Sequence, residues 1–190
     1  SRGLGDVYKR QATGDAHEGT LTSTENISPT LIHQEFIKTV GIFVNETLDN
    51  LVTIATEVNL DAVQLHGDED EAFIQSLKER TNVEVWKAIQ IRSAADAEAW
   101  IDSSADMLLF DAYHKDERGG TGEVFDWSCL DEFERPFMLA GGIDSTNVAR
   151  AIRTVRPYGI DISSGIETEG VKDNEKIKAF TNIVRTIAMP

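Results

Sequence analysis

Residues 136–167 read PFMLAGGIDSTNVARAIRTVRPYGIDISSGIE, in which two short apolar runs flank a helical pattern. The runs Phe137–Ala140 and Gly159–Ile162 have the length of buried strands, and Ser145–Val155 carries apolar residues at helical spacing. A strand, a helix and a second strand in this order predict a βα unit of a parallel sheet.

The same unit recurs along the chain. From Val40 onward, the apolar runs begin 22, 21, 24, 30 and 22 residues apart. The predicted strands are Val40–Val44, Ala62–Leu65, Val83–Ala88, Met107–Phe110, Phe137–Ala140 and Gly159–Ile162. The predicted helices are Leu48–Val58, Asp70–Arg80, Ala94–Ser103, Ser145–Val155 and Asn174–Ile187. The sequence therefore predicts an α/β fold with about six βα units.

The strand ends distinguish a closed barrel from an open sheet. Polar residues or glycines follow every strand but the third: Asn45, His66-Gly67, Asp111, Gly141-Gly142 and Ser163-Ser164-Gly165. An open sheet would concentrate such residues at one switch point, whereas a barrel places chemistry around its whole carboxyl-terminal face. We therefore predict a (βα)8 TIM barrel that lacks its first strand, its first helix and its second strand.

Composition narrows the class of protein. The chain has 190 residues, one cysteine, 18 basic and 33 acidic residues, and a net charge of −15. These values indicate a soluble globular protein with no disulfide framework and no cysteine-based zinc site. The negative charge argues against nucleic acid as a partner, and no apolar run is long enough for a membrane helix. We expect a cytoplasmic protein that is a monomer or a homodimer.

The N-terminal region divides into two parts before the barrel units. Residues 1–11 show no periodicity, and DVYKRQ at 6–11 resembles the translation of a transposon-end adaptor, so we interpret them as an artefact. Residues 12–36 read as an irregular or partial second unit. Residues 37–190 hold barrel units three to eight.

Two glycine-rich strand ends predict a phosphate site. Gly141 and Gly142 end one strand, and Ser163, Ser164 and Gly165 end the next. Glycines let backbone N–H groups approach an anion, and loops after the last two barrel strands often bind phosphate. The alternative is that these glycines only make tight turns.

Other candidate residues each allow a plainer interpretation. Asp111 directly follows an apolar strand and suits a general acid, or it bonds the local backbone. His66 could bond a ligand or cap its strand. The run 116–122, with three glycines, suggests a mobile loop over the site or an ordinary surface loop. Cys129 has no base partner nearby and reads as a structural thiol.

At these motifs the sequence resembles the phosphoribosylanthranilate isomerase family. The matching segments are VGIFVN at 40–45, VQLHG at 63–67, LLFDA at 108–112, GGTG-x-x-FDW at 119–127, LAGGI-x-x-x-NV at 139–148, RPYGIDISSGIE at 156–167 and KD-x-x-KI-x-x-F at 172–180. The resemblance implies an enzyme of tryptophan biosynthesis that performs an Amadori rearrangement of N-(5-phosphoribosyl)anthranilate to 1-(2-carboxyphenylamino)-1-deoxyribulose 5-phosphate.

The resemblance also implies that the reaction uses no cofactor and no metal, and it implies roles for residues. Asp111 would be the general acid that protonates the ribose ring oxygen, after which a Schiff base forms. A cysteine in a CGIT-like motif would then remove the C2′ proton. The substrate phosphate would be held at the positions of Gly141, Gly142, Ser163, Ser164 and Gly165, with Asp161 lining the same region.

The chain departs from the family near its N-terminus. No CGIT-like motif is present, and an alignment with the family's carboxylate-binding arginine puts Glu25 at that position. We therefore expect this chain to be inactive as written. The alternatives are a non-catalytic remnant, a piece of a fused tryptophan-pathway enzyme, or another phosphate-binding barrel enzyme.

Overall fold

The computed structural model describes residues 7–11, 38–112 and 126–188. The chain divides into two compact units, Ser1–Trp86 and Lys87–Pro190, here called the first and the second unit. Each unit is described by itself.

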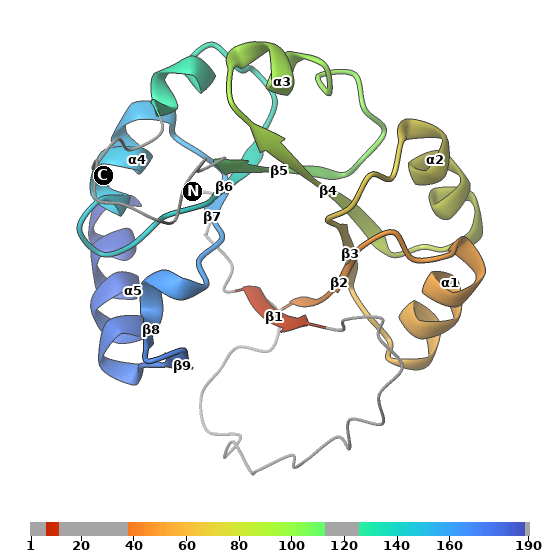
Figure 1. The fold of residues 1–190 in the computed structure, drawn as a ribbon, viewed down its shortest axis with the longest axis horizontal. Helices are drawn as coiled ribbons and strands as arrows, with labels where there is room; N and C mark the ends of the chain where they lie inside the picture. The colour runs from red at the N-terminus through yellow and green to blue at the C-terminus, as the bar shows by residue number, and fades with distance from the viewer. Residues whose placement is uncertain (1–6, 12–37, 113–125, 189–190) are drawn as a thin grey trace. The chain divides into compact units, whose positions relative to one another are not determined.

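The first unit alternates parallel strands with helices. Its elements are β1 (Val7–Gln11), β2 (Lys38–Phe43), α1 (Leu48–Glu57), β3 (Ala62–Leu65) and α2 (Glu71–Arg80). Strand β2 lies between β1 and β3 and pairs in parallel with both. Helices α1 and α2 pack against each other (Figure 1).

Side-chain caps and apolar faces fix the two helices of the first unit. The Asp70 carboxylate accepts a hydrogen bond from the Phe73 N–H at 2.9 Å and so satisfies a free donor at the start of α2. Leu51 in α1 and Ile74 and Leu77 in α2 are fully buried. Burying these faces provides most of the stability that short helices lack alone.

Strand β1 differs from the expectation that no strand precedes residue 37. Its five residues pair with β2 in a regular register that runs from Val7 opposite Lys38 to Gln11 opposite Ile42. Parallel pairing uses backbone groups that every residue except proline carries, so an apolar pattern is not required for it.

The second unit continues the alternation. Strand β4 (Glu84–Ile91) contains the boundary between the units. It is followed by α3 (Ala94–Glu98), β5 (Met107–Ala112), the 3-10 helix η2 (Trp127–Leu130), β6 (Phe137–Ala140), α4 (Val148–Val155), β7 (Gly159–Ile160), the 3-10 turn η3 (Ser164–Ile166), the hairpin strands β8 (Glu167–Thr168) and β9 (Val171–Lys172), and α5 (Asn174–Ala188). Helix α4 packs against α5 and η2 (Figure 1).

The strands of the second unit present two different faces. Leu109, Met138 and Ala140 belong to one buried cluster. Phe110 points to the other face, where its ring lies 5.0 Å from the rings of Phe133 and Phe137. Because side chains alternate along a strand, Asp111 lies on the same face of β5 as Leu109, at the carboxyl end.

Helices α1 and α2 are one residue shorter than predicted, whereas α3 and α4 are shorter by several residues, and side chains explain these two larger differences. Helix α3 ends at Glu98, and the Arg135 guanidinium accounts for the irregular chain that follows, because it donates to the carbonyls of Ser103, at 2.7 Å, and Ala105. Helix α4 begins at Val148 because the Asp144 carboxylate accepts from the Thr146 N–H at 2.7 Å and holds a turn there.

The described residues contain six strands that are each followed by a helical element, β2 to β7, as the sequence predicts. The pairs β1–β2, β2–β3, β5–β6 and β6–β7 run parallel and follow one another in chain order, whereas the hairpin strands β8 and β9 pair antiparallel. None of the described helices is long and apolar enough to cross a membrane.

Candidate functional site

The general-acid candidate and the first glycine pair meet at the ends of β5 and β6. Asp111 stands opposite Ala140 in the parallel register, and Gly141 follows Ala140 directly. Asp111 is half-buried, whereas Ala140 is 5% exposed. The structure therefore places the carboxylate-bearing residue next to the glycine-rich strand end.

The end of β6 needs its glycines. Gly141 and Gly142 have φ values of 83° and 61°, which side-chain-bearing residues rarely adopt. The Asn147 amide donates to the Gly142 carbonyl at 2.8 Å and accepts from the Asp144 N–H at 3.0 Å. Because a trans peptide points its C=O and N–H in opposite directions, the Ile143 N–H points away from Asn147.

The second glycine-rich segment lies directly on the first. A Cβ atom added at Gly165 would stand 2.1 Å from the Ile143 carbonyl oxygen and 3.1 Å from the Asp144 Cα. Both atoms belong to backbone and cannot move aside as a flexible side chain could. Only glycine therefore allows residues 141–144 and 163–165 to touch, and this contact brings the two predicted halves of the phosphate site together.

Several backbone N–H groups of these two segments have no hydrogen-bond partner within the described ranges. Among the described residues, no acceptor is found for the N–H groups of Gly142, Ile143, Ser164 and Gly165. Asp161 enters the same region from the end of β7, where its N–H donates to the Leu139 carbonyl at 2.8 Å, and its side chain is half-buried. The arrangement can bind an anion through backbone N–H groups.

A lysine that the sequence analysis did not single out supports the second segment. The Lys172 ammonium donates to the Ser163 carbonyl at 2.8 Å and to the Ser163 hydroxyl at 3.2 Å, and it pairs with the Glu167 carboxylate at 2.5 Å. Lys172 reaches Ser163 because β8 and β9 form a hairpin whose turn, Glu169-Gly170, has positive φ at both residues. The KD motif at 172–173 was the only sequence signal.

His66 belongs to the first unit and follows β3. Its backbone N–H donates to the Phe43 carbonyl at 2.8 Å, and its Nδ1 lies 3.0 Å from the Gln64 Nε2. Gln64 is fully buried, and its Oε1 has no hydrogen-bond partner among the described residues. An amide N–H donated to Nδ1 would leave the His66 Nε2 as the ring donor.

Glu69 holds the strand ends of the first unit and was not predicted. Its carboxylate accepts from the Asn45 N–H at 2.7 Å and from the Gly67 N–H at 2.9 Å, and the residue is only 7% exposed. No spacing rule indicates it, because its partner Asn45 is 24 residues away. A buried carboxylate thus occupies the backbone donors at this edge.

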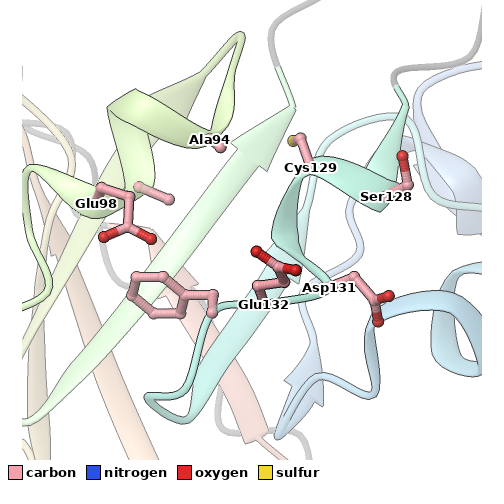
Figure 2. Close-up of a pocket in the computed structure, with 8 residues that line it drawn as sticks. Ala94, Glu98, Ser128, Cys129, Asp131 and Glu132 are labelled. Carbon is pink, nitrogen blue, oxygen red and sulfur yellow. The ribbon is translucent and has the colours of Figure 1, made fainter.

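A separate cavity of about 300 Å³ lies between α3 and η2 (Figure 2). Figure 2 shows Cys129 beside it, together with the side chains of Glu98, Asp131 and Glu132. Burial raises the pKa of the Cys129 thiol, and the Asp126 charge raises it further. The interpretation of Cys129 as an unreactive thiol is consistent with this position, and the acidic lining does not suit an anionic ligand.

Some predicted features fall outside the described residues, namely residues 12–36 with Glu25, and the glycine loop at 116–122. Within the described ranges, no group of three or more His, Cys, Asp or Glu side chains is arranged to hold a metal ion.

Comparisons with known proteins agree with the motif order. The sequence profile of the family described as N-(5'phosphoribosyl)anthranilate (PRA) isomerase matches residues 6–183. A relative from Thermoanaerobacter sp. strain X514, named N-(5'-phosphoribosyl)anthranilate isomerase, is 48% identical over 153 residues, which are 80% of this chain and 74% of the relative.

Solved structures give the same result. The crystal structure of phosphoribosyl anthranilate isomerase from Thermotoga maritima has a TM-score of 0.70 and 35% identity, covering 80% of this chain and 74% of that one. A structure of such an isomerase in complex with reduced 1-(o-carboxyphenylamino)-1-deoxyribulose 5-phosphate has a TM-score of 0.67 and 33% identity, covering 80% and 73%. The predicted barrel fold is thereby confirmed, and the chain belongs to the N-(5'-phosphoribosyl)anthranilate isomerase family of enzymes.

Proposed function

We propose that this protein binds N-(5-phosphoribosyl)anthranilate through its phosphate and takes part in the Amadori rearrangement of tryptophan biosynthesis. The observation that carries the proposal is the contact between Gly165 and Ile143, which joins two glycine-rich strand ends beside Asp111. A relative of solved structure holds a phosphorylated product analogue, which supports a phosphorylated small molecule as the ligand.

The phosphate would be held by backbone N–H groups of residues 142–143 and 164–165 and by the hydroxyls of Ser163 and Ser164. Such groups suit a dianion because each N–H carries partial positive charge and needs no side-chain reorganisation. The protein carries a net charge of −15, so its overall field opposes an anion. Local donors must therefore provide the attraction.

Asp111 is assigned the first chemical step. Its carboxylic acid would donate a proton to the ribose ring oxygen, the bond from that oxygen to C1′ would break, and the anilino nitrogen would form the C1′=N Schiff base. The support is positional, since Asp111 lies at the carboxyl end of β5 and beside the glycine pair of β6. This is the face on which barrel enzymes carry their catalytic residues.

The second step removes a proton from C2′ and needs a base. The sequence contains one cysteine, Cys129, whose thiol has a raised pKa and lies beside α3 and η2. Cys129 is thus unsuited to replace the cysteine that the family uses, and we propose that the chain as printed binds the ligand without completing the isomerisation. A monomeric or homodimeric state and a cytoplasmic location stay predictions.

The phosphate assignment can be tested by adding a negative charge at Gly142. Gly142→Asp would put a carboxylate against the anion, and we expect the affinity for the reduced product analogue to fall by about 100-fold or more. Isothermal titration calorimetry on the 190-residue chain measures it.

Gly170→Asp is the matched control for this experiment. Gly170 also has positive φ, at 78°, and a Cβ there would meet no atom within 4 Å. The control adds the same charge and a similar backbone strain at the hairpin turn but none at the strand end, so any loss of affinity should stay within the roughly tenfold expected from disturbing Lys172 and well below that of Gly142→Asp. Equal losses in the two variants would remove the assignment of Gly142.

A further inference from the structure

We propose that Lys172 is a positioning residue of the phosphate site, which orients the donors of Ser163 and Ser164 toward the anion. The inference rests on the proposed function, because it concerns the same segment, 163–165. It goes further by assigning a role to a side chain that lies outside the glycine-rich strand ends.

The first argument concerns the peptide between Ser163 and Ser164. Lys172 donates to the carbonyl of this peptide at 2.8 Å. In a trans peptide the Ser164 N–H points away from that carbonyl, so the lysine lies on one side and a free donor on the other. A cation on the carbonyl oxygen polarises the peptide and makes its N–H a stronger donor.

The second argument concerns the Ser163 hydroxyl. Its oxygen lies 3.2 Å from the Lys172 ammonium, which has only donors to offer. The hydroxyl oxygen must therefore accept in this contact, and its own hydrogen points elsewhere. Ser163 is exposed, so that hydrogen is available to an anion bound at the segment.

The third argument concerns the ion pair that holds Lys172. The Glu167 carboxylate lies 2.5 Å from the Lys172 ammonium, and the two side chains are 24% and 49% exposed, respectively. The carboxylate fixes the lysine but also adds a negative charge near the site. The two partners of one ion pair should therefore affect phosphate binding in opposite directions.

The experiment measures the binding of inorganic phosphate to the 190-residue chain, followed by the amide NMR signals of Ser164 and Gly165. For Lys172→Met we expect the Kd to rise about tenfold. Lys172→Arg keeps the charge and the donors and should restore binding to within about threefold of the unchanged protein.

Two further variants separate positioning from a merely structural effect. Lys178→Met removes a lysine of α5 that pairs with Glu175 at 2.8 Å and is 69% exposed, and it should leave the Kd unchanged. Glu167→Gln removes the carboxylate charge but can still accept from Lys172, so it should leave the Kd unchanged or lower it. A Kd raised by Glu167→Gln as much as by Lys172→Met would overturn the inference.

The same data separate this inference from the proposed function. If phosphate moves no signal of residues 163–165 in the unchanged protein, there is no phosphate site and both ideas fail. If phosphate binds there but Lys172→Met behaves like Lys178→Met, only the role of Lys172 is lost.

Discussion

The strand ends of the two units hold their backbone donors in opposite ways. After β2 and β3, the buried Glu69 carboxylate accepts from the N–H groups of Asn45 and Gly67. After β6 and β7, side chains bond the carbonyls instead, Asn147 at Gly142 and Lys172 at Ser163. At the first edge a buried carboxylate accepts from the backbone N–H groups, whereas at the second edge the N–H groups of Gly142 and Ser164 have no acceptor among the described residues.

This difference shows what a glycine at a strand end can and cannot mean. Gly67 packs closely against Asn45, since a Cβ added at Gly67 would stand 2.3 Å from the Asn45 Oδ1. Gly165 is just as tightly placed against Ile143. Tight packing is therefore common to both edges, and they differ in whether the N–H groups at the strand ends themselves meet a buried carboxylate, as those of Asn45 and Gly67 do at Glu69.

The largest effect is expected from Asp111, at the carboxyl end of β5 in the second unit. In a version of the chain that carries the family's CGIT-like motif, Asp111→Asn keeps the shape but cannot supply the proton. General acid catalysis contributes about 10²–10⁴-fold, so kcat should fall by that factor, measured by the loss of substrate fluorescence. A loss below about tenfold would place the acid elsewhere.

The sequence predicts most of the elements because their apolar patterns are local. Ala62–Leu65 and Phe137–Ala140 are strands with the predicted bounds, and Asn174–Ala188 extends the predicted helix by one residue. The strand β7 ends at Ile160, two residues early, where the chain turns into the 163–165 segment. Predicted boundaries fail where a side chain or the backbone of a loop overrides the local pattern.

The sequence predicts less of the site because its supporting contacts are not local. The glycines and Asp111 stand at strand ends, which periodicity reveals. Lys172 reaches Ser163 only through the turn of the β8–β9 hairpin, and Glu69 meets Asn45 only when β2 and β3 pair. Partners of this kind depend on tertiary structure, which residue spacing does not encode.

The second-largest effect is expected from breaking the contact between residues 141–144 and 163–165. Gly165→Ala would put a methyl group 2.1 Å from the Ile143 carbonyl oxygen, so the two segments must separate. We expect the free energy of unfolding in urea to fall by about 3 kcal/mol and phosphate binding to be lost.

Gly170→Ala serves as the control for Gly165→Ala. Gly170 has a φ of 78° and open space around its Cβ position, so alanine adds only backbone strain of about 1–2 kcal/mol there. Phosphate should still bind to this variant. If Gly165→Ala bound phosphate equally well, the contact between the segments would not be needed for the site.

A smaller effect is expected at Glu69, which accepts from the strand ends after β2 and β3. Glu69→Gln leaves one oxygen to accept, so one of the two N–H groups of Asn45 and Gly67 loses its partner. A buried donor without a partner costs about 1–3 kcal/mol, and we expect a loss near the lower end in urea unfolding. Glu79→Gln, at an exposed position of α2, should change stability by less than about 0.5 kcal/mol. Equal effects of the two substitutions would contradict the role of Glu69.

The smallest effect is expected at Asp61. This exposed carboxylate lies at the opposite ends of β2 and β3 from the buried Glu69 and can be compared with it. Asp61 accepts from the Thr39 N–H at 2.6 Å and from the Thr39 hydroxyl at 2.8 Å. The backbone hydrogen bond from Thr39, helped by the hydroxyl, lowers the pKa of Asp61 below its ordinary value. Asp61 thus resembles Glu69 in accepting from a backbone N–H group, but Asp61 is exposed to water, whereas Glu69 is buried.

The lowered pKa of Asp61 fixes the direction of the pH dependence. A carboxyl whose folded pKa is lowered stabilises the protein above its unfolded pKa, about 3.9 for aspartate, and this contribution is lost as pH falls through the folded pKa. Asp61→Asn should therefore reduce the free energy of unfolding at pH 6 by about 0.5 kcal/mol or less, since solvent screens the group.

Between pH 6 and pH 2.5 the difference between Asp61→Asn and the unchanged protein should shrink, because Asp61 takes up a proton as the pH falls toward its lowered pKa, whereas asparagine stays neutral. Urea unfolding at the two pH values measures it, with Asp102→Asn, an exposed position without a hydrogen bond in the described structure, as the control. If Asp61→Asn lowered the free energy of unfolding as much as Glu69→Gln does, then exposure to water would not reduce the contribution of a carboxylate at these strand ends. A difference that grows as the pH falls would contradict the sign of the Asp61 contribution.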